Sequence, residues 1–89
     1  MNAIPHPGLA IMEAMKAEGL TMARLTKGDS ALTNRFSRVI HGQANITPQT
    51  AAHLAACTGG KYPMEYWIRV QAQYDLARAM EYAAQEGLQ

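Results

Sequence analysis

The fold of this chain is decided by the stretch TMARLTKGDSALTNRFSRVIHG, which covers residues 21–42. Its second part predicts an amphipathic helix over residues 30–41, because large apolar residues recur there at i, i+4, i+7 and i+8. Those residues are Leu32, Phe36, Val39 and Ile40. Its first part predicts a short helix over residues 21–28, which Thr21 caps and Gly28 ends. Asp29 or Ser30 then begins the second helix, so a tight turn separates the two.

The rest of the chain predicts three more helices, at residues 7–18, 47–58 and 63–85. Pro7 and Pro48 stand at first helical positions, and Gly19 provides a stop. No sustained alternation of apolar and polar residues is present, so strands lack their main sequence signal. With 89 residues, the chain is long enough for one domain and too short for two. We therefore expect one compact, all-α, five-helix domain over residues 1–89.

The composition excludes several classes of protein. Hydrophobic residues make up 48% and charged residues 17% of the chain, which is typical of a globular domain and not of a disordered one. The single cysteine, Cys57, cannot form an internal disulfide, which favours a reducing, cytoplasmic setting. No targeting signal is visible, and no stretch approaches the ~18 apolar residues of a membrane span, so we expect no membrane partner.

The charges are unevenly distributed, although the net charge is only +1. Residues 24–38 hold four bases and a single acid, Asp29, whereas residues 65–89 hold more acids than bases. The four bases are Arg24, Lys27, Arg35 and Arg38. A basic middle segment of this kind favours a polyanionic partner such as DNA.

The two helices around Gly28 are typical of a helix-turn-helix, whose second helix lies in the major groove of DNA. The polar face of the helix over residues 30–41 carries groove-reading residue types, since arginine can pair with guanine and asparagine with adenine. These candidates are Thr33, Asn34, Arg35, Ser37, Arg38 and His41. Polarity alone does not indicate DNA binding, because any exposed helix face is polar. The position of this helix, between a short capped helix and a glycine stop, favours the DNA interpretation. Candidates for phosphate contacts are Arg24, Lys27, Gln43 and Thr47, the last of which is also a plain helix cap.

Catalysis and metal binding are disfavoured by the sequence. His53 and Cys57 share a helix face at i, i+4, but two ligands do not complete a zinc site, and no third group is present to orient a Cys-His pair. No glycine-rich phosphate loop or carboxylate pair stands out. We expect a binding protein that is not an enzyme and has no metal and no cofactor.

Several short motifs occur together in a recognisable order. They are His6-Pro7-Gly8, Gly19-Leu20-Thr21, Ile46-Thr47-Pro48, Tyr66-Trp67 and Gln71-Ala72-Gln73-Tyr74-Asp75-Leu76. In this order they resemble the HigA-type antitoxins, a branch of the Cro/cI-like helix-turn-helix repressors, over about residues 6–78. The resemblance implies a dimer that represses its own operon at a palindromic operator and neutralises a HigB-type mRNA-cleaving toxin.

The resemblance also assigns roles to residues. The base-reading positions of the family fall on the polar face of the 30–41 helix, with His41 where the family usually has asparagine. Dimerisation in the family maps to the last helix, whose aromatic and apolar stripe is larger than one small core needs. The dimer candidates there are Trp67, Val70, Gln71, Tyr74 and Ala77.

The turn departs from the family pattern, with Asp29 at an apolar core position, Ser30 in place of the turn glycine and Leu32 in place of the usual serine cap. An unpaired buried Asp29 would be costly, so we expect the first of the two helices to be shortened or rotated until Asp29 is exposed. Two alternatives stay open. One is a protein-interaction module of the same fold with degenerate DNA binding, and the other is a phage-type repressor without a toxin.

Overall fold

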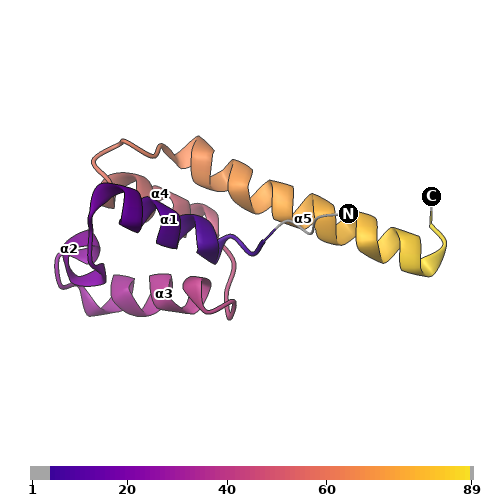
Figure 1. The fold of residues 1–89 in the computed structure, drawn as a ribbon, viewed down its shortest axis with the longest axis horizontal. Coiled ribbons are helices and arrows are strands. Elements are labelled where there is room, and N and C mark those ends of the chain that lie inside the picture. Colours follow the sequence, from indigo (N-terminus) through magenta and orange to yellow (C-terminus); the bar gives the residue numbers. More distant parts are fainter. Residues whose placement is uncertain (1–4, 89) are drawn as a thin grey trace.

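Five α-helices and no strand make up residues 5–88, the part of the chain that this computed structural model describes. The helices are α1 (Gly8–Glu18), α2 (Met22–Thr26), α3 (Ser30–Ile40), α4 (Pro48–Cys57) and α5 (Met64–Glu86), as Figure 1 shows. The all-α prediction is therefore confirmed for these residues. Residues 1–4 and 89, which the sequence assigned to the same domain, lie outside the described residues.

Three side chains cap helices at the predicted starts. The side-chain oxygens of Thr21, Asp29 and Thr47 accept the backbone N–H three residues on, at 3.2, 3.0 and 3.2 Å respectively. Each satisfies one of the N–H groups that a helix start leaves without a partner. The choice between Asp29 and Ser30 as the start of α3 is thereby settled in favour of Asp29 as the cap.

α2 ends at Thr26, two residues before the predicted end of the 21–28 helix, so the expected shortening is confirmed. Lys27 and Gly28 both adopt left-handed backbone angles, with φ of 54° and 79°. The Gly28 N–H donates to the Ala23 carbonyl at 3.0 Å, which closes the last turn of α2 and redirects the chain. The early end leaves Asp29 exposed, as its charge requires.

The core lies where α1, α3, α4 and the first half of α5 meet. Trp67 and Phe36 are its largest members, and both are fully buried. Trp67 keeps its polar atom satisfied, since Nε1–H donates to the Tyr62 carbonyl at 3.1 Å. Smaller buried residues from α1 to α4 and from the loop before α4 complete the core: Ile11, Ala14, Leu25, Val39, Ile46, Ala51 and Leu54.

The start of α1 lies directly against the end of α3. Gly8 is buried, and a Cβ at this position would lie 2.7 Å from the Ile40 Cα and 2.8 Å from the Val39 carbonyl carbon. Only a residue without a side chain permits this approach of two backbones. The Gly8 N–H also donates to His6 Nδ1 at 3.1 Å, so the preceding residues help to begin the helix.

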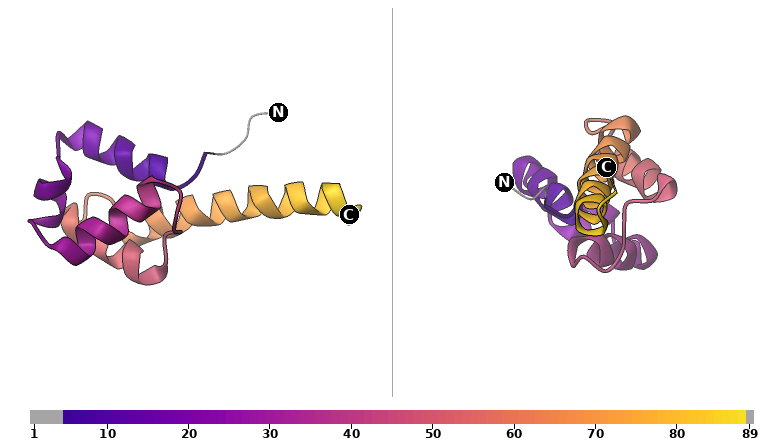
Figure 2. Two further views of the ribbon diagram at one scale, coloured as in Figure 1. Left: turned by 90° about the horizontal axis from the view of Figure 1, so that it is seen from below. Right: turned by 90° about the vertical axis from the view of Figure 1, so that its right-hand side faces the viewer.

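The second half of α5 projects beyond the body of the molecule. The described residues span 47 × 22 × 22 Å, and the long dimension comes from this helix, which Figures 1 and 2 show extending past α1 to α4. No residue of α5 after Gln71 is buried. None of the described helices combines the length and the apolar character that a bilayer crossing requires.

Candidate nucleic-acid interface

A chain of hydroxyl groups fixes α2 against α3. Thr26 Oγ1 and Thr33 Oγ1 lie 2.8 Å apart, and each is also within hydrogen-bond distance of a carbonyl, that of Met22 at 3.0 Å and that of Asp29 at 2.8 Å. Because each hydroxyl has one proton, one threonine donates to the other and the second donates to its carbonyl. Thr26 is buried and Thr33 is half-buried. This pair therefore links α2 to α3 through their side chains.

The side-chain hydroxyls of two predicted DNA contacts, Thr33 and Thr47, already make hydrogen bonds within the protein. Thr33 has its hydroxyl in the turn just described, because a residue at the edge of α3 faces α2. Thr47 accepts the Thr50 N–H and donates to Thr50 Oγ1 at 3.1 Å, as a helix cap. The structure therefore gives both threonines structural roles, although Thr47 itself is exposed.

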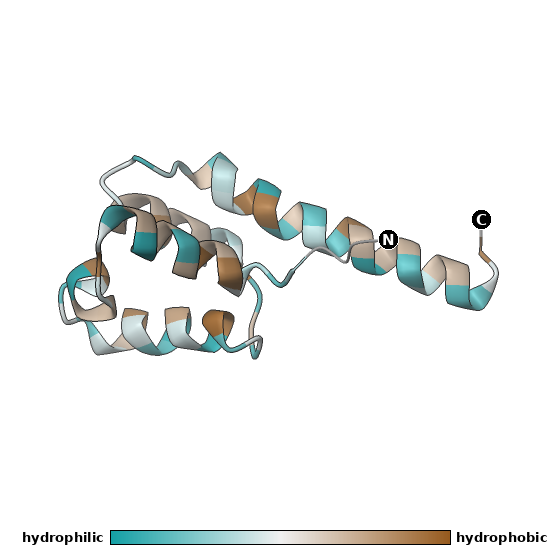
Figure 3. Ribbon diagram, viewed as in Figure 1, coloured by the Kyte–Doolittle hydropathy of each residue, from teal (hydrophilic) through white to brown (hydrophobic). Residues whose placement is uncertain are grey.

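The outward ridge of α3 is formed by Asn34, Arg38 and His41, all of which are exposed. They recur at i, i+4 and i+7, which places them along one side of the helix. Figure 3 shows hydrophilic colours along the side of α3 that faces away from α1. His41 is held in place because its Nδ1 donates to the Ser37 carbonyl at 2.7 Å, which leaves Nε2 for another partner.

Arg35 and Ser37 flank this ridge. Arg35 is exposed, but it stands one turn before the buried Val39 and one turn after the half-buried Leu32. Arg35 therefore stands at the edge of the exposed face, whereas Arg38 stands on the outward ridge. Ser37 is half-buried on the opposite flank.

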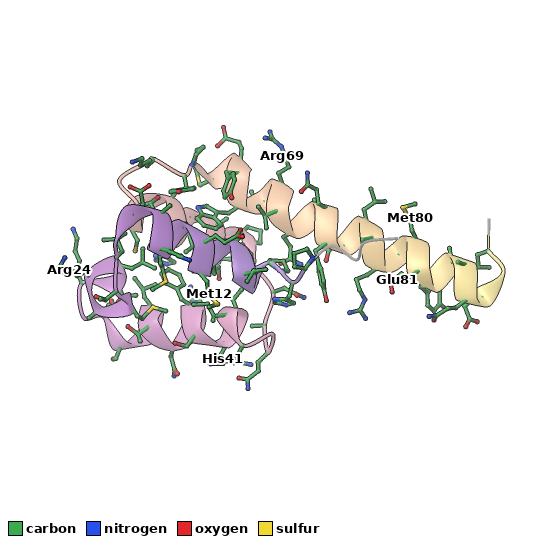
Figure 4. All side chains as sticks on the ribbon, viewed as in Figure 1. Met12, Arg24, His41, Arg69, Met80 and Glu81 are labelled. Carbon is green, nitrogen blue, oxygen red and sulfur yellow. The ribbon has the colours of Figure 1, made fainter. Side chains whose placement is uncertain are left out.

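The remaining predicted contacts lie at the two ends of the α2 to α3 unit. Arg24 and Lys27 are exposed at α2 and its turn, and Gln43 is exposed just after α3. Figure 4 shows Arg24 at the α2 end and His41 at the far end of α3. These predicted contacts therefore stand at both ends of the α2 to α3 unit, with the ridge of α3 between them.

The cations of this surface are free of ion pairs within residues 5–88. The one ion pair there joins Lys61 Nζ to Glu18 Oε1 at 2.8 Å, away from α3, and it raises the pKa of Lys61. Asp29 is the single acid among the four bases, and its carboxylate is occupied by the Leu32 N–H. Because four bases outnumber this one acid, the described surface of α2 and α3 carries a net positive charge that an anionic partner can neutralise.

The His53 and Cys57 pair forms no site in the structure. His53 is exposed on α4, and burial raises the pKa of the Cys57 thiol, an effect that the nearby Lys27 partly offsets. Among residues 5–88, no group of three or more histidine, cysteine or acidic residues is arranged to hold a metal ion. A thiol with a raised pKa is a poor nucleophile at neutral pH.

The predicted dimer stripe of α5 faces the protein's own body. Trp67 is fully buried and Gln71 is 8% exposed, so neither side chain is available to a second chain. Val70, Tyr74 and Ala77 are half-buried, and Tyr74 packs edge-on against His6 with ring centroids 5.1 Å apart. Their assignment as dimer contacts is wrong for Trp67 and Gln71, because helical periodicity marks an apolar stripe without saying which element covers it.

A different set of apolar side chains on α5 is exposed, and it belongs to the apolar surplus that the sequence predicts for this helix. Ile68, Leu76 and Met80 are 49%, 61% and 64% exposed. They stand on the other side of the helix from Trp67, and Figure 4 shows Met80 on the projecting half. Their 4- and 8-residue spacing was the signal available in the sequence.

Two proteins of Dichelobacter nodosus are similar to this chain over most of its length. Virulence-associated protein A' is 30% identical over 84 residues, which are 94% of this chain and 72% of that protein. Virulence-associated protein I is 32% identical over 81 residues, which are 88% of this chain and 73% of that protein. No protein-family model matches the chain, and no solved structure matches it. This chain thus belongs to the family of bacterial virulence-associated proteins that includes A' and I.

Proposed function

We propose that the protein is an operator-binding repressor with a Cro/cI-like helix-turn-helix, and the antitoxin of a HigB-type toxin. The observation that carries the proposal is the exposed ridge of Asn34, Arg38 and His41 on α3, next to a short capped α2. Such a ridge presents donors and acceptors that can read base edges in the major groove. The proposal involves binding without catalysis and without a cofactor.

The charge of the surface supports a DNA partner. Arg24, Lys27 and Arg35, which lie beside the base-reading ridge, are exposed and without ion pairs among the described residues, so each can neutralise a phosphate. A dimer would then make about six phosphate contacts. A plot of the logarithm of its affinity against the logarithm of the salt concentration would have a slope of about −5. An apolar protein interface would show little dependence on salt.

The proposed DNA-binding form is a homodimer joined through the exposed side of α5. Ile68, Leu76 and Met80 are apolar and lie on the far side from the core. An isolated helix shorter than ~12–15 residues is marginal in water, so the projecting half of α5 gains stability if a second copy covers it. Two recognition helices about 34 Å apart would read a palindromic operator.

The intact turn favours this proposal over an interaction module with degenerate DNA binding. Asp29, the main departure from the family pattern, caps α3 and is exposed, so it does not disturb the packing of α2 on α3. The toxin partner is supported by the resemblance to HigA-type antitoxins, and a phage-type repressor without a toxin is the remaining alternative.

The test is a gel-shift titration of the purified protein against the DNA upstream of its own gene, at two salt concentrations and with random competitor DNA. We expect a competitor-resistant shift that weakens steeply with salt. A folded protein that gives no specific shift would refute the repressor proposal. Co-purification with the product of a neighbouring small basic reading frame tests the toxin, and a repressor that binds DNA but no such product would favour the phage type.

A further inference from the structure

Gln71 is a buried polar residue in the first half of α5, outside the proposed DNA surface. It is 8% exposed, and its Oε1 accepts the Ile46 N–H at 2.7 Å. Its Nε2 donates to Asp75 Oδ1, one turn later on the same helix, at 2.9 Å. The amide can have only one orientation, because a backbone N–H only donates and a carboxylate only accepts.

The partner of this amide lies in the loop between α3 and α4. At the start of the loop, the Gln43 N–H donates to the Arg38 carbonyl at 2.8 Å, which anchors that end to α3. At the other end, the Ile46 side chain is 5% exposed in the core, and its N–H is held by Gln71. Gln43 and Asn45, between these two anchors, are exposed.

We infer that Gln71 is a positioning residue for DNA binding, an inference that rests on the proposed repressor function. By fixing Ile46 it sets where the loop lies relative to α3, and hence where Gln43 and Asn45 meet the DNA backbone beyond His41. Without the acceptor, the Ile46 N–H would be buried without a hydrogen-bond partner, which costs free energy. The loop can lower its free energy by moving so that this N–H meets water. Because α5 also carries the proposed dimer contacts, Gln71 joins the dimer helix to the DNA surface.

Three variants and a control separate the two hydrogen bonds. Gln71→Met removes both at similar volume. Gln71→Glu keeps an acceptor for the Ile46 N–H but places a second carboxylate beside Asp75. Adding Asp75→Asn removes that repulsion, because the new asparagine amide can donate to the Glu carboxylate at position 71. The matched control is Gln73→Met, because Gln73 is an exposed glutamine of the same helix whose side chain has no hydrogen-bond partner among residues 5–88.

The experiment combines operator titration with amide hydrogen exchange at Ile46, with sedimentation and circular dichroism as checks of assembly and fold. For Gln71→Met we expect faster Ile46 exchange and operator affinity at least about tenfold weaker, because a buried N–H loses its partner. The Gln71→Glu, Asp75→Asn double variant should return to within about threefold of the original affinity. Gln73→Met should leave both measurements unchanged.

The outcomes distinguish this inference from the function on which it rests. If the unmodified protein binds no operator, the repressor proposal fails, and the positioning role fails with it. If the unmodified protein binds but Gln71→Met binds equally well despite faster Ile46 exchange, only the inference is overturned, because the bond is then purely structural. Unchanged Ile46 exchange in Gln71→Met would overturn it as well.

Discussion

Replacing Gly8 with alanine tests the packing of α1 on α3 directly. The added methyl would overlap the Val39 carbonyl oxygen and lie 2.7 Å from the Ile40 Cα. All of these neighbours are backbone atoms, so no side chain can rotate out of the way. The start of α1 must move by roughly 1 Å to reach an ordinary contact distance.

Two opposing effects determine the size of the change. Overpacking in a rigid setting costs about 1–3 kcal/mol, and backbone neighbours favour the upper end of that range. Alanine in a helix recovers at most about 1 kcal/mol relative to glycine. The free energy of unfolding should therefore fall by about 2 kcal/mol. In a domain of this size, that corresponds to a melting temperature lower by about 8–16 °C.

The assay is thermal and urea denaturation of the Gly8→Ala variant followed by circular dichroism. Gly19→Ala is the matched control, because Gly19 has a left-handed φ of 65° with nothing within 4 Å of the added Cβ. The control carries only conformational strain, about 1–2 kcal/mol. A Gly8→Ala variant as stable as the original would refute the close approach of the two backbones.

Three further predictions concern the surfaces of the protein. Arg38→Ala should cost about 1–3 kcal/mol of operator affinity in gel shifts, and Arg35→Ala should cost less, because Arg38 stands on the outward ridge of α3; equal losses would contradict that placement. Leu76→Glu should shift the protein toward monomer in sedimentation with little change in helix content, since Leu76 is 61% exposed; an intact dimer would exclude this side of α5. The raised pKa of Cys57 leaves less thiolate at any given pH, so alkylation at pH 8 should be slower than for a free thiol and should accelerate on unfolding. Equal rates in the folded and unfolded protein would argue against its burial.

Much of the local structure is determined by short-range interactions that the sequence displays. Thr21 and Thr47 cap helices where the sequence predicts, because each bond joins residues three apart. The repeat of apolar residues in α3 correctly identifies its buried side, on which Phe36 and Val39 are fully buried. The exposure of Asp29 also follows from sequence, because its charge forbids an unpaired buried position.

The placement of side chains between helices could not be predicted in the same way. Thr33 is a polar residue on the edge of α3 by sequence, and only its contact with Thr26 shows that its hydroxyl is occupied in the turn. Arg35 and Arg38 are equivalent by type, and the position of the buried Val39 distinguishes them. α2 ends two residues before its predicted end at Gly28, because Lys27, the residue before the glycine, already adopts the left-handed conformation.

The sequence by itself determined which segments are helical and where the basic residues gather, because periodicity, caps and charge are local properties of the chain. Only the tertiary structure decided what covers each apolar stripe. Trp67 and Gln71 looked suited to a second chain, yet α5 buries them against its own body and leaves Leu76 and Met80 exposed. The bond from Gln71 to Ile46 spans 25 residues, and its geometry exists only after the helices have packed.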